Sequence, residues 1–334
     1  MGAFEENEIS EKSNGGTEQV KRMISQRLTL PQDVTDEFQV ICSRVRKIEE
    51  DKIRVYWLHD LPSDPETNHL KDRSSRDRFH KYVFCGNWQY NQYLTTLGIV
   101  PDDKCAVIDT PIVPIELQPK VLDQEIRLIY TSTPQRGLAI LVPVFEELCK
   151  HHDNIVLDVF SSFNIYGWGH ADEQFKELFD KCKSNPKINY HGTQPNEVVR
   201  EALTKAHIFS YPSIWQECNS RSLIEAMSAG CLCVHPNLAG LSDTSGSLTS
   251  MYQFVDNVND HANKFFHILN HSINVVKTEE AQNYLRFVKA YADSRFNIVK
   301  IAGIWDDLLV SLHEKYKDPA SRSVPGATFS YRTV

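Results

Sequence analysis

Two carboxylates with a spacing suited to ligand binding, Glu217 and Glu225, stand eight positions apart in the stretch SIWQECNSRSLIEAMSAG (residues 213–230). They flank a polar Cys-Asn-Ser run that precedes a short apolar helical pattern. The strand pattern HIFSY ends immediately before Pro212. The residues after this proline are therefore expected to form a loop at the carboxyl edge of a sheet, where the ligands of such sheets bind.

The helix that follows this loop is expected to start near Asn219 or Ser220, because both residues are favourable N-caps. The free N–H groups of residues 219–222 would point toward the same edge and form a site for phosphate oxygens. At about 1.5 Å per residue, Glu225 lies roughly 9 Å along the helix axis from Asn219. This length is comparable to the span of a nucleotide sugar from hexose to ribose. One glutamate could then accept hydrogen bonds from sugar hydroxyls and the other from ribose hydroxyls.

The position of Glu225 on the helix allows a second interpretation. Arg221, Glu225 and Ser228 share the face opposite the apolar one, so Glu225 is expected to face away from the core. In the alternative, Glu225 only pairs with Arg221 one turn earlier, and Glu217 is a solvated loop residue.

Composition excludes several classes of partner. The formal charge of −8 and the lack of a Lys/Arg block leave no basic surface for nucleic acid or anionic lipid. No apolar run approaches the roughly 18 residues of a membrane span, and the acidic N-terminus is unlike a signal peptide. Eight cysteines in 334 residues are too sparse for a disulfide scaffold, and the C-x-C at Cys231 and Cys233 lacks a second ligand pair. We expect a cytoplasmic protein with reduced thiols, no membrane span and no metal.

Short apolar runs alternate with helical patterns along the chain, which is typical of doubly wound parallel sheets. The fold class is therefore α/β. The expected strands are FQVIC (38–42), KIRVYWL (52–58), KYVFC (81–85), KCAVI (104–108), IRLIY (126–130), NIVLDVF (154–160), KINYH (187–191), HIFSY (207–211) and CLCVH (231–235). After them, residues 258–317 are expected to be helical only.

One segment interrupts this alternation. Residues 109–123, DTPIVPIELQPKVLD, contain three prolines and have no period, so we interpret them as an interdomain linker. The predicted organisation is a small N-terminal Rossmann-like domain (1–115), a C-terminal Rossmann-like domain (116–300), and a crossing-back helix with a loose tail (301–334). The two domains are expected to face each other across a cleft that binds the ligand.

The stretch YPSIWQECNSRSLIEAMSAG, followed by CLCVHPNLAGLSD, resembles the E-x7-E motif of family 4 retaining glycosyltransferases of the GT-B fold. The resemblance implies transfer of a hexose from a nucleotide-diphosphate sugar (a UDP-, GDP- or ADP-sugar) to a glycan, lipid or small-molecule acceptor. It implies no metal and no other cofactor. It also implies that Glu217 positions the donor sugar, while the donor phosphate acts as the base.

Other segments are similar to the same family in the same order and supply further candidate residues. In TSTPQRGLAILVPVFEEL the pair Arg136-Gly137 matches the donor-phosphate loop, and an Arg guanidinium suits the leaving diphosphate. His59 ends a strand at a position that contacts the sugar or assists the acceptor in the family. The resemblance thus implies Glu217, Arg136 and His59 as catalytic residues. The implied donor-binding residues are Gly15, Gly16, Thr131, Arg136, Gly137, Tyr166, His191, Gly192, Glu217, Cys218, Asn219, Ser220, Arg221 and Glu225.

The sequence departs from the family pattern at Tyr130-Thr131, where the family has Gly-Arg before the phosphate loop. One phosphate-binding cation is therefore missing unless Arg221 replaces it, and the short N-terminal domain leaves the acceptor undefined. Two alternatives remain: a GT-B sugar-nucleotide epimerase, and a catalytically silent sugar-nucleotide-binding protein. A nicotinamide dehydrogenase is disfavoured because no strand leads into G-x-G-x-x-G.

Overall fold

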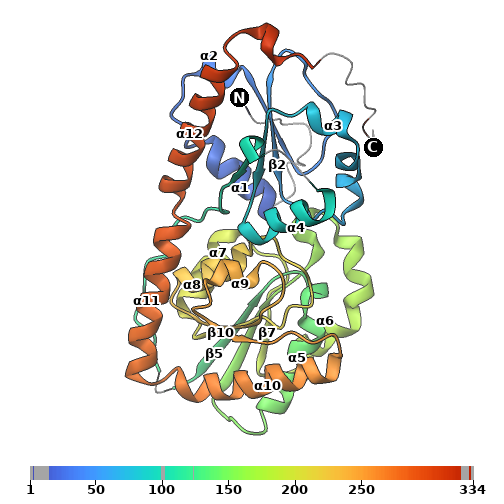
Figure 1. Ribbon diagram of the computed structural model, residues 1–334. Coiled ribbons are helices and arrows are strands. Elements are labelled where there is room, and N and C mark those ends of the chain that lie inside the picture. The colour runs from blue at the N-terminus through green and yellow to red at the C-terminus, as the bar shows by residue number, and fades with distance from the viewer. Residues whose placement is uncertain (1–2, 4–14, 99–101, 123, 325–330, 332–334) are drawn as a thin grey trace. The chain divides into compact units, whose positions relative to one another are not determined.

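The computed structural model describes Ala3, residues 15–98, 102–122 and 124–324, and Tyr331. The N-terminal stretch before Gly15, Ala3 excepted, and most of the predicted C-terminal tail lie outside the described residues. The chain divides into two compact units, with boundaries after Pro111 and after Asn297 (Figure 1). Unit 1 contains residues 16–111 and the chain from Ile298 onward, and unit 2 contains Ile112–Asn297.

Unit 1 is built on a sheet of four parallel strands in the order β1-β2-β3-β4. The strands are β1 (Phe38–Cys42), β2 (Ile53–Leu58), β3 (Lys81–Phe84) and β4 (Cys105–Val107). The helices are α1 (Gly16–Ser25), α2 (Gln32–Thr35), α3 (Arg73–Asp77), α4 (Asn87–Leu97) and α12 (Ile298–Lys315). Every residue of β2 is buried, as a strand covered on both faces requires.

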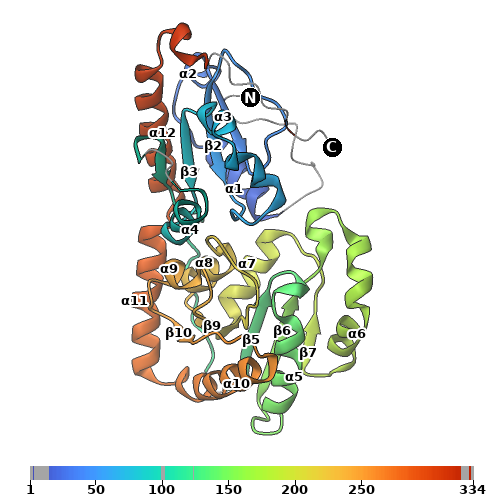
Figure 2. The same cartoon turned by 45° about the vertical axis from the view of Figure 1, so that its right-hand side comes forward.

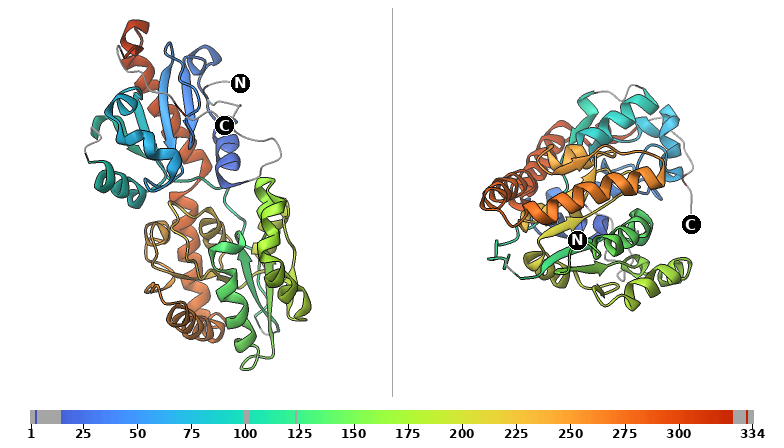
Figure 3. Two further views of the ribbon diagram at one scale, coloured as in Figure 1. Left: turned by 90° about the vertical axis from the view of Figure 1, so that its right-hand side faces the viewer. Right: turned by 90° about the horizontal axis from the view of Figure 1, so that it is seen from below.

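The last long helix, α12, completes unit 1 although it is far along the chain (Figure 3). Trp305 on α12 packs against Trp57 on β2, with ring centres 4.8 Å apart. The hydroxyl of Thr29 donates a hydrogen bond to the carboxylate of Asp306 at 2.8 Å, so the segment between α1 and α2 is also bound to this helix. These contacts bury the apolar side of α12 against the first sheet.

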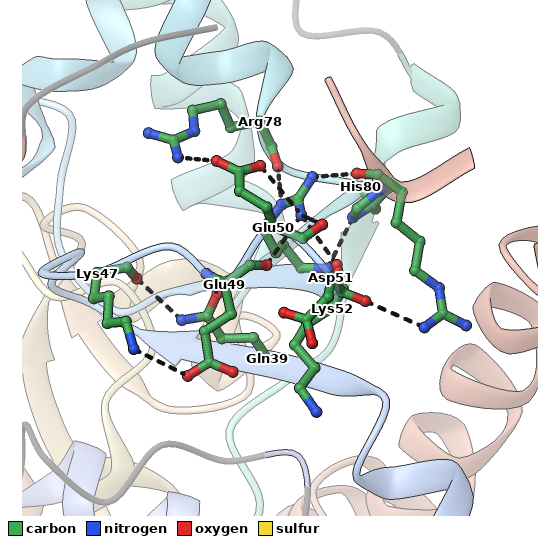
Figure 4. Close-up of polar contacts among 10 residues, drawn as sticks. Gln39, Lys47, Glu49, Glu50, Asp51, Lys52, Arg78 and His80 are labelled. Atoms are coloured by element: carbon green, nitrogen blue, oxygen red, sulfur yellow. Dashed lines mark hydrogen bonds and ion pairs between the residues drawn. The ribbon is translucent and has the colours of Figure 1, made fainter. Parts of the chain in front are cut away.

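A buried arginine on β2 organises the amino edge of this sheet. The guanidinium of Arg54 donates to the backbone carbonyls of Arg78 and Arg322, each at 2.6 Å, and to Glu49 at 3.1 Å. Burial lowers the pKa of Arg54, and the nearby carboxylate of Glu50 opposes this effect. Glu50 also pairs with Arg78, as Figure 4 shows. Arg54 therefore helps to hold the C-terminal segment after α12 to the sheet, together with the ion pair of Arg322 with Glu37 at 2.6 Å.

We expect Arg54→Met to lower the free energy of unfolding by about 3 kcal/mol, because several buried carbonyl groups lose a charged donor. Urea denaturation followed by circular dichroism measures this change. Arg73→Met is the matched control, since Arg73 is 84% exposed and its ion pair with Asp77 lies at the surface. Equal effects of the two substitutions would contradict the structural role of Arg54.

Unit 2 contains a sheet of six parallel strands in the order β10-β9-β8-β5-β6-β7. The strands are β5 (Ile126–Thr131), β6 (Ile155–Phe160), β7 (Ile188–Tyr190), β8 (Ile208–Ser210), β9 (Leu232–Pro236) and β10 (Ser250–Tyr252). All nine predicted strand patterns are confirmed across the two units. The sequence analysis missed β10, a three-residue edge strand without an apolar run.

Helices pack against the second sheet (Figure 2). They are α5 (Leu138–Leu148), α6 (Lys176–Ser184), α7 (Asn196–Lys205), α8 (Arg221–Ser228), α9 (Leu241–Ser245), α10 (Val258–Val275) and α11 (Glu279–Arg295). Together with α12, the last two confirm the prediction that residues 258–317 are helical. No helix in the described ranges has the length and apolar character needed to cross a membrane.

His235, fully buried on β9, carries a pH-dependent part of the stability of unit 2. Its Nε2 lies 2.7 Å from the hydroxyl of Thr249, and Nδ1 lies 2.8 Å from the carbonyl of Pro236. Burial lowers the pKa of His235 to about 4. In the folded protein His235 stays neutral at pH values where the same histidine in the unfolded chain, with a pKa near 6.5, binds a proton. The free energy of unfolding therefore decreases as the pH falls below about 6.5.

We expect the wild-type protein to lose about 1.3 kcal/mol more unfolding free energy than His235→Asn between pH 7.5 and pH 5.5. The measurement is a series of denaturation curves for both proteins across this pH range. Parallel pH profiles of the two proteins would show that His235 is not held neutral.

Candidate functional site

The strand order of unit 2 fixes the place where a ligand is expected. The chain runs from β5 to β6 and β7 on one side, then returns to β8, β9 and β10 on the other. The order therefore reverses between β5 and β8, and ligands of such sheets bind at the carboxyl ends of the strands at this switch point. The loop after β5 carries Arg136, and the loop after β8 carries Glu217.

These two residues, predicted from distant parts of the sequence, meet in the structure. Nη1 of Arg136 lies 2.7 Å from Oε1 of Glu217, and the carboxylate side chain is only 10% exposed. The hydroxyl of Tyr211 donates a hydrogen bond to the same oxygen. Glu217 is therefore a buried, paired carboxylate, and the alternative of a solvated loop residue is wrong.

Arg136 keeps its positive charge although it is partly buried. Burial alone would lower its pKa, but the carboxylate of Glu217 and the phenol of Tyr211 outweigh this effect and raise the pKa. The pKa of Tyr211 is also raised, by burial and by the same carboxylate. Arg136 is thus a permanent cation, and Tyr211 remains a neutral hydrogen-bond donor.

The contact between the two loops depends on Gly137. A Cβ at this position would lie 2.2 Å from the carbonyl oxygen of Pro212, and the backbone has φ +130°. No other residue type fits both the spacing and the dihedral angle. On the other side of the Glu217 loop, a Cβ at Gly240 would lie 2.2 Å from the carbonyl oxygen of Cys218. The loop that carries Glu217 is therefore packed closely against two glycines, one on each side.

Helix α8 begins where the sequence predicted, with Ser220 as its N-cap residue. Its first turn is tied to β5, because the hydroxyl of Ser222 donates to the carbonyl of Thr131 at 2.8 Å. The amide of Ser220 donates to the hydroxyl of Thr244 at 3.4 Å. Cys218 and Asn219 lie in the same segment, immediately before the helix.

The position of Glu225 differs from the prediction made from the sequence. Glu225 was expected to face away from the core, but it is buried. Its Oε1 accepts from Arg221 at 2.9 Å and from Arg200 at 3.2 Å, while Oε2 has a long contact of 3.5 Å with Asn196. Glu225 does pair with Arg221, as the alternative interpretation expected, and Arg200 from α7 completes an Arg-Glu-Arg cluster. In this arrangement Arg221 is engaged with Glu225 rather than set apart for a phosphate.

His191 follows β7 and is held in one orientation. Its Nε2 lies 2.9 Å from Oδ1 of Asp158, and its ring stacks on Phe160 with ring centres 4.3 Å apart. Arg127 bonds the other oxygen of Asp158 at 2.7 Å. The neighbouring Gly192 has φ +62°, which turns the chain away from the strand.

The remaining predicted residues lie at several places. Thr131 is the last residue of β5, and Tyr166 belongs to the 3₁₀ segment Phe163–Tyr166 after β6. Gly15 and Gly16 lie at the start of α1, and Gly16 is its first residue. His59 follows β2 in unit 1, where burial lowers its pKa to about 3. It lies 3.5 Å, through Nδ1, from the thiol of Cys85.

Three residues that shape the site, Tyr211, Arg200 and Asp158, were not predicted from the sequence. Tyr211 gave a weak signal, since a phenol just before Pro212 ends a strand at the carboxyl edge. Arg200 and Asp158 gave no signal, because the residues they pair with, Glu225 and Arg127, are 25 and 31 positions away in the sequence. The described residues contain no group of three His, Cys, Asp or Glu side chains that could hold a metal ion.

A family model described as "Glycosyl transferases group 1" matches residues 123–284, which include Arg136, Glu217 and Glu225. Among curated proteins, the chain is similar to the phosphatidylinositol N-acetylglucosaminyltransferase GPI3 subunit of Saccharomyces cerevisiae, with 21% identity over 146 residues. This match covers 44% of the chain and only 30% of the relative. The Schizosaccharomyces pombe gpi3 subunit is 22% identical over 108 residues, which are 32% of the chain and 22% of that relative.

Solved structures give the fold over a larger part of the chain. A glycosyltransferase from Rickettsia africae superposes with a TM-score of 0.65 and 15% identity, covering 92% of this chain and 84% of that one. Anabaena HepE in complex with UDP and glucose has a TM-score of 0.60 and 16% identity, with coverage of 78% and 72%. The fold is that of GT-B glycosyltransferases. The prediction of an α/β fold with two Rossmann-like units is thereby confirmed.

We expect Gly137→Ala to lower the free energy of unfolding by about 3 kcal/mol, from the clash with Pro212 and the strained dihedral angle together. Thermal unfolding measures the loss. Gly98→Ala is the control, because Gly98 also has a positive φ but no atom within 4 Å of its added Cβ. A loss at Gly137 no larger than that at Gly98 would show that the loops are not in close contact.

Proposed function

We propose that the protein is a family 4 retaining glycosyltransferase, independent of metal, that transfers a hexose from a nucleotide-diphosphate sugar to an acceptor. The observation that carries this proposal is the Arg136–Glu217 pair at the switch point of unit 2, inside the range that matches glycosyl transferases group 1. The ligands of the HepE complex, UDP and glucose, favour a UDP-hexose as the donor. A cytoplasmic location is part of the proposal.

Arg136 is the proposed electrophilic group of the reaction. When the bond from the anomeric carbon to the diphosphate oxygen breaks, negative charge develops on the leaving phosphate. A guanidinium that stays protonated can stabilise this charge with two hydrogen bonds. The acceptor hydroxyl forms the new bond to the anomeric carbon on the same face and gives its proton to the leaving phosphate oxygen. No protein nucleophile is needed in this scheme.

The proposed role of Glu217 is to hold the transferred sugar. Its Oε1 is occupied by Arg136 and Tyr211, so Oε2 is the oxygen that would accept from sugar hydroxyls. Glu225 is proposed to meet the ribose through Oε2, whose contact with Asn196 is long at 3.5 Å. The amides at the start of α8 would lie along the diphosphate. His59, Tyr166, His191, Gly15 and Gly16 remain proposed contacts with donor or acceptor.

The proposal is tested by donor binding and turnover. We expect UDP-glucose, among UDP-, GDP- and ADP-sugars, to stabilise the protein by about 2.7 kcal/mol at 100 times its dissociation constant. Arg136→Ala and Glu217→Ala should each weaken donor binding by about tenfold or more, because a charge-assisted hydrogen bond is lost. Calorimetric titration and release of UDP measure the two effects.

Arg286→Ala is the matched control, since Arg286 is an exposed arginine of the same unit, on α11. It should bind and turn over the donor as the wild type does. The proposal would be refuted if no sugar nucleotide binds. It would also be refuted if Arg136→Ala and Glu217→Ala bind the donor as tightly as the wild type does. Binding without UDP release in the presence of glycan, lipid and small-molecule acceptors would instead identify a catalytically silent binding protein, which Thr131 in place of an arginine favours.

A further inference from the structure

The loop that carries Glu217 also exposes a large aromatic ring. Trp215 is 49% exposed and its neighbour Ile214 is 48% exposed. Contiguous apolar surface with a polar rim is typical of interaction sites when it is extensive, and these two side chains can form part of such a surface. Nothing in the proposed roles of Arg136 and Glu217 requires an indole at this position.

The backbone of Trp215 is fixed before any ligand arrives. The hydroxyl of Ser213 accepts from the amide of Trp215 at 3.2 Å and lies 3.1 Å from its carbonyl oxygen. The amide of Ile214 reaches the carbonyl of Arg136 at 3.4 Å. A ring on a rigid loop loses little conformational entropy when a ligand covers it, which favours its use as a contact surface.

The indole lies beside the charged pair of the site. The guanidinium carbon of Arg136 is 5.9 Å from the centre of the Trp215 ring, within the range of a cation–π contact. The same guanidinium bonds Oε1 of Glu217 at 2.7 Å. Among the described residues, both bonds to this carboxylate use Oε1. The indole and the carboxylate of Glu217 are therefore both neighbours of the same guanidinium.

We infer that Trp215 forms a stacking surface for a pyranose ring, and this inference rests on the proposed function of the site. A pyranose carries hydroxyl groups around its rim and C–H groups on its faces. The free carboxylate oxygen suits neighbouring hydroxyls, and the negative face of the indole suits the C–H groups. A nucleobase would also stack, but it has no pair of hydroxyls for Glu217. The ring is either the hexose of the donor or a sugar of the acceptor.

A second aromatic pair lies in the segment that follows β6. Tyr166 and Trp168 lie with ring centres 5.2 Å apart, and Trp168 is 47% exposed. The phenol of Tyr166 is close enough to contribute to the raised pKa of Arg136. Two aromatic rings after β6 thus accompany the charged pair, and one of them, Tyr166, acts on Arg136 electrostatically. This arrangement suits a ligand with flat apolar faces and a polar rim.

The test compares Trp215→Ala with Trp215→Phe and with Phe287→Ala, a matched loss of a 57% exposed aromatic ring on α11. Calorimetry measures the binding of UDP-glucose and of UDP. If the donor hexose stacks, Trp215→Ala weakens UDP-glucose by about five- to tenfold and changes UDP by less than about twofold. Trp215→Phe should retain most of the affinity, and Phe287→Ala all of it.

A second arm distinguishes the acceptor as the source of the ring. D-Glucose is titrated into the protein saturated with UDP, and an acceptor subsite predicts weaker glucose binding in Trp215→Ala with unchanged UDP-glucose binding. An equal loss for UDP and UDP-glucose would overturn the inference, because the indole would then contact the base or diphosphate. No loss in either arm would also overturn it.

Failure of the proposed function gives a different result. In that case the wild-type protein binds neither UDP nor UDP-glucose, and Arg136→Ala changes nothing. Glucose alone, titrated into the wild type and Trp215→Ala, then still tests the stacking surface. Equal glucose binding by these two proteins, or none by either, overturns the inference.

Discussion

The close approach of Gly137 to Pro212 is the constraint on which the candidate site depends. A Cβ at position 137 would lie 2.2 Å from the carbonyl oxygen of Pro212, so any other side chain would push the two loops apart. The Arg136 guanidinium reaches Glu217 only because the backbones meet in this way. The parallel strands β5 and β8 bring the loops to the same edge, and the glycine brings them into contact. A backbone feature thus sets the distance between two charges.

The charged groups of the site are paired with one another without any ligand. Burying an isolated carboxylate costs several kcal/mol, and the pairings of Glu217 with Arg136 and of Glu225 with Arg200 and Arg221 offset this. A bound diphosphate would therefore compete with an internal carboxylate for Arg136. This competition reduces affinity for the ligand, but it holds the guanidinium in place before binding. Preorganised charge is the form of electrostatic stabilisation that costs no rearrangement during reaction.

The strands were predictable from sequence, and most of the site contacts were not. Strands such as β2 and β6 are buried on both faces, which leaves a continuous apolar run that is visible in the sequence. The start of α8 after Ser220 was also predicted correctly, although the Ser220 side chain makes no capping hydrogen bond. The burial of Glu225 was not, because it depends on Arg200 from a different helix. Tyr211 lay within a correctly predicted segment, yet its bond to Glu217 follows from how the loop folds back.

Thr131 stands where the resemblance expects a phosphate-binding arginine, and its surroundings differ from an ordinary protein interior. Among the described residues, the buried side-chain oxygens of Thr131, Thr133, Gln135 and Ser161 have no hydrogen-bond partner. Thr131 ends β5, Thr133 and Gln135 belong to the loop that carries Arg136, and Ser161 follows β6. Buried polar atoms are almost always paired, so this sheet edge offers several groups that water or a ligand would bond. Hydroxyl and amide groups can share the contacts of a missing guanidinium, although they bring no charge. Under the proposed function, Arg136 would supply positive charge at this edge, and the neutral groups around it would supply further hydrogen bonds.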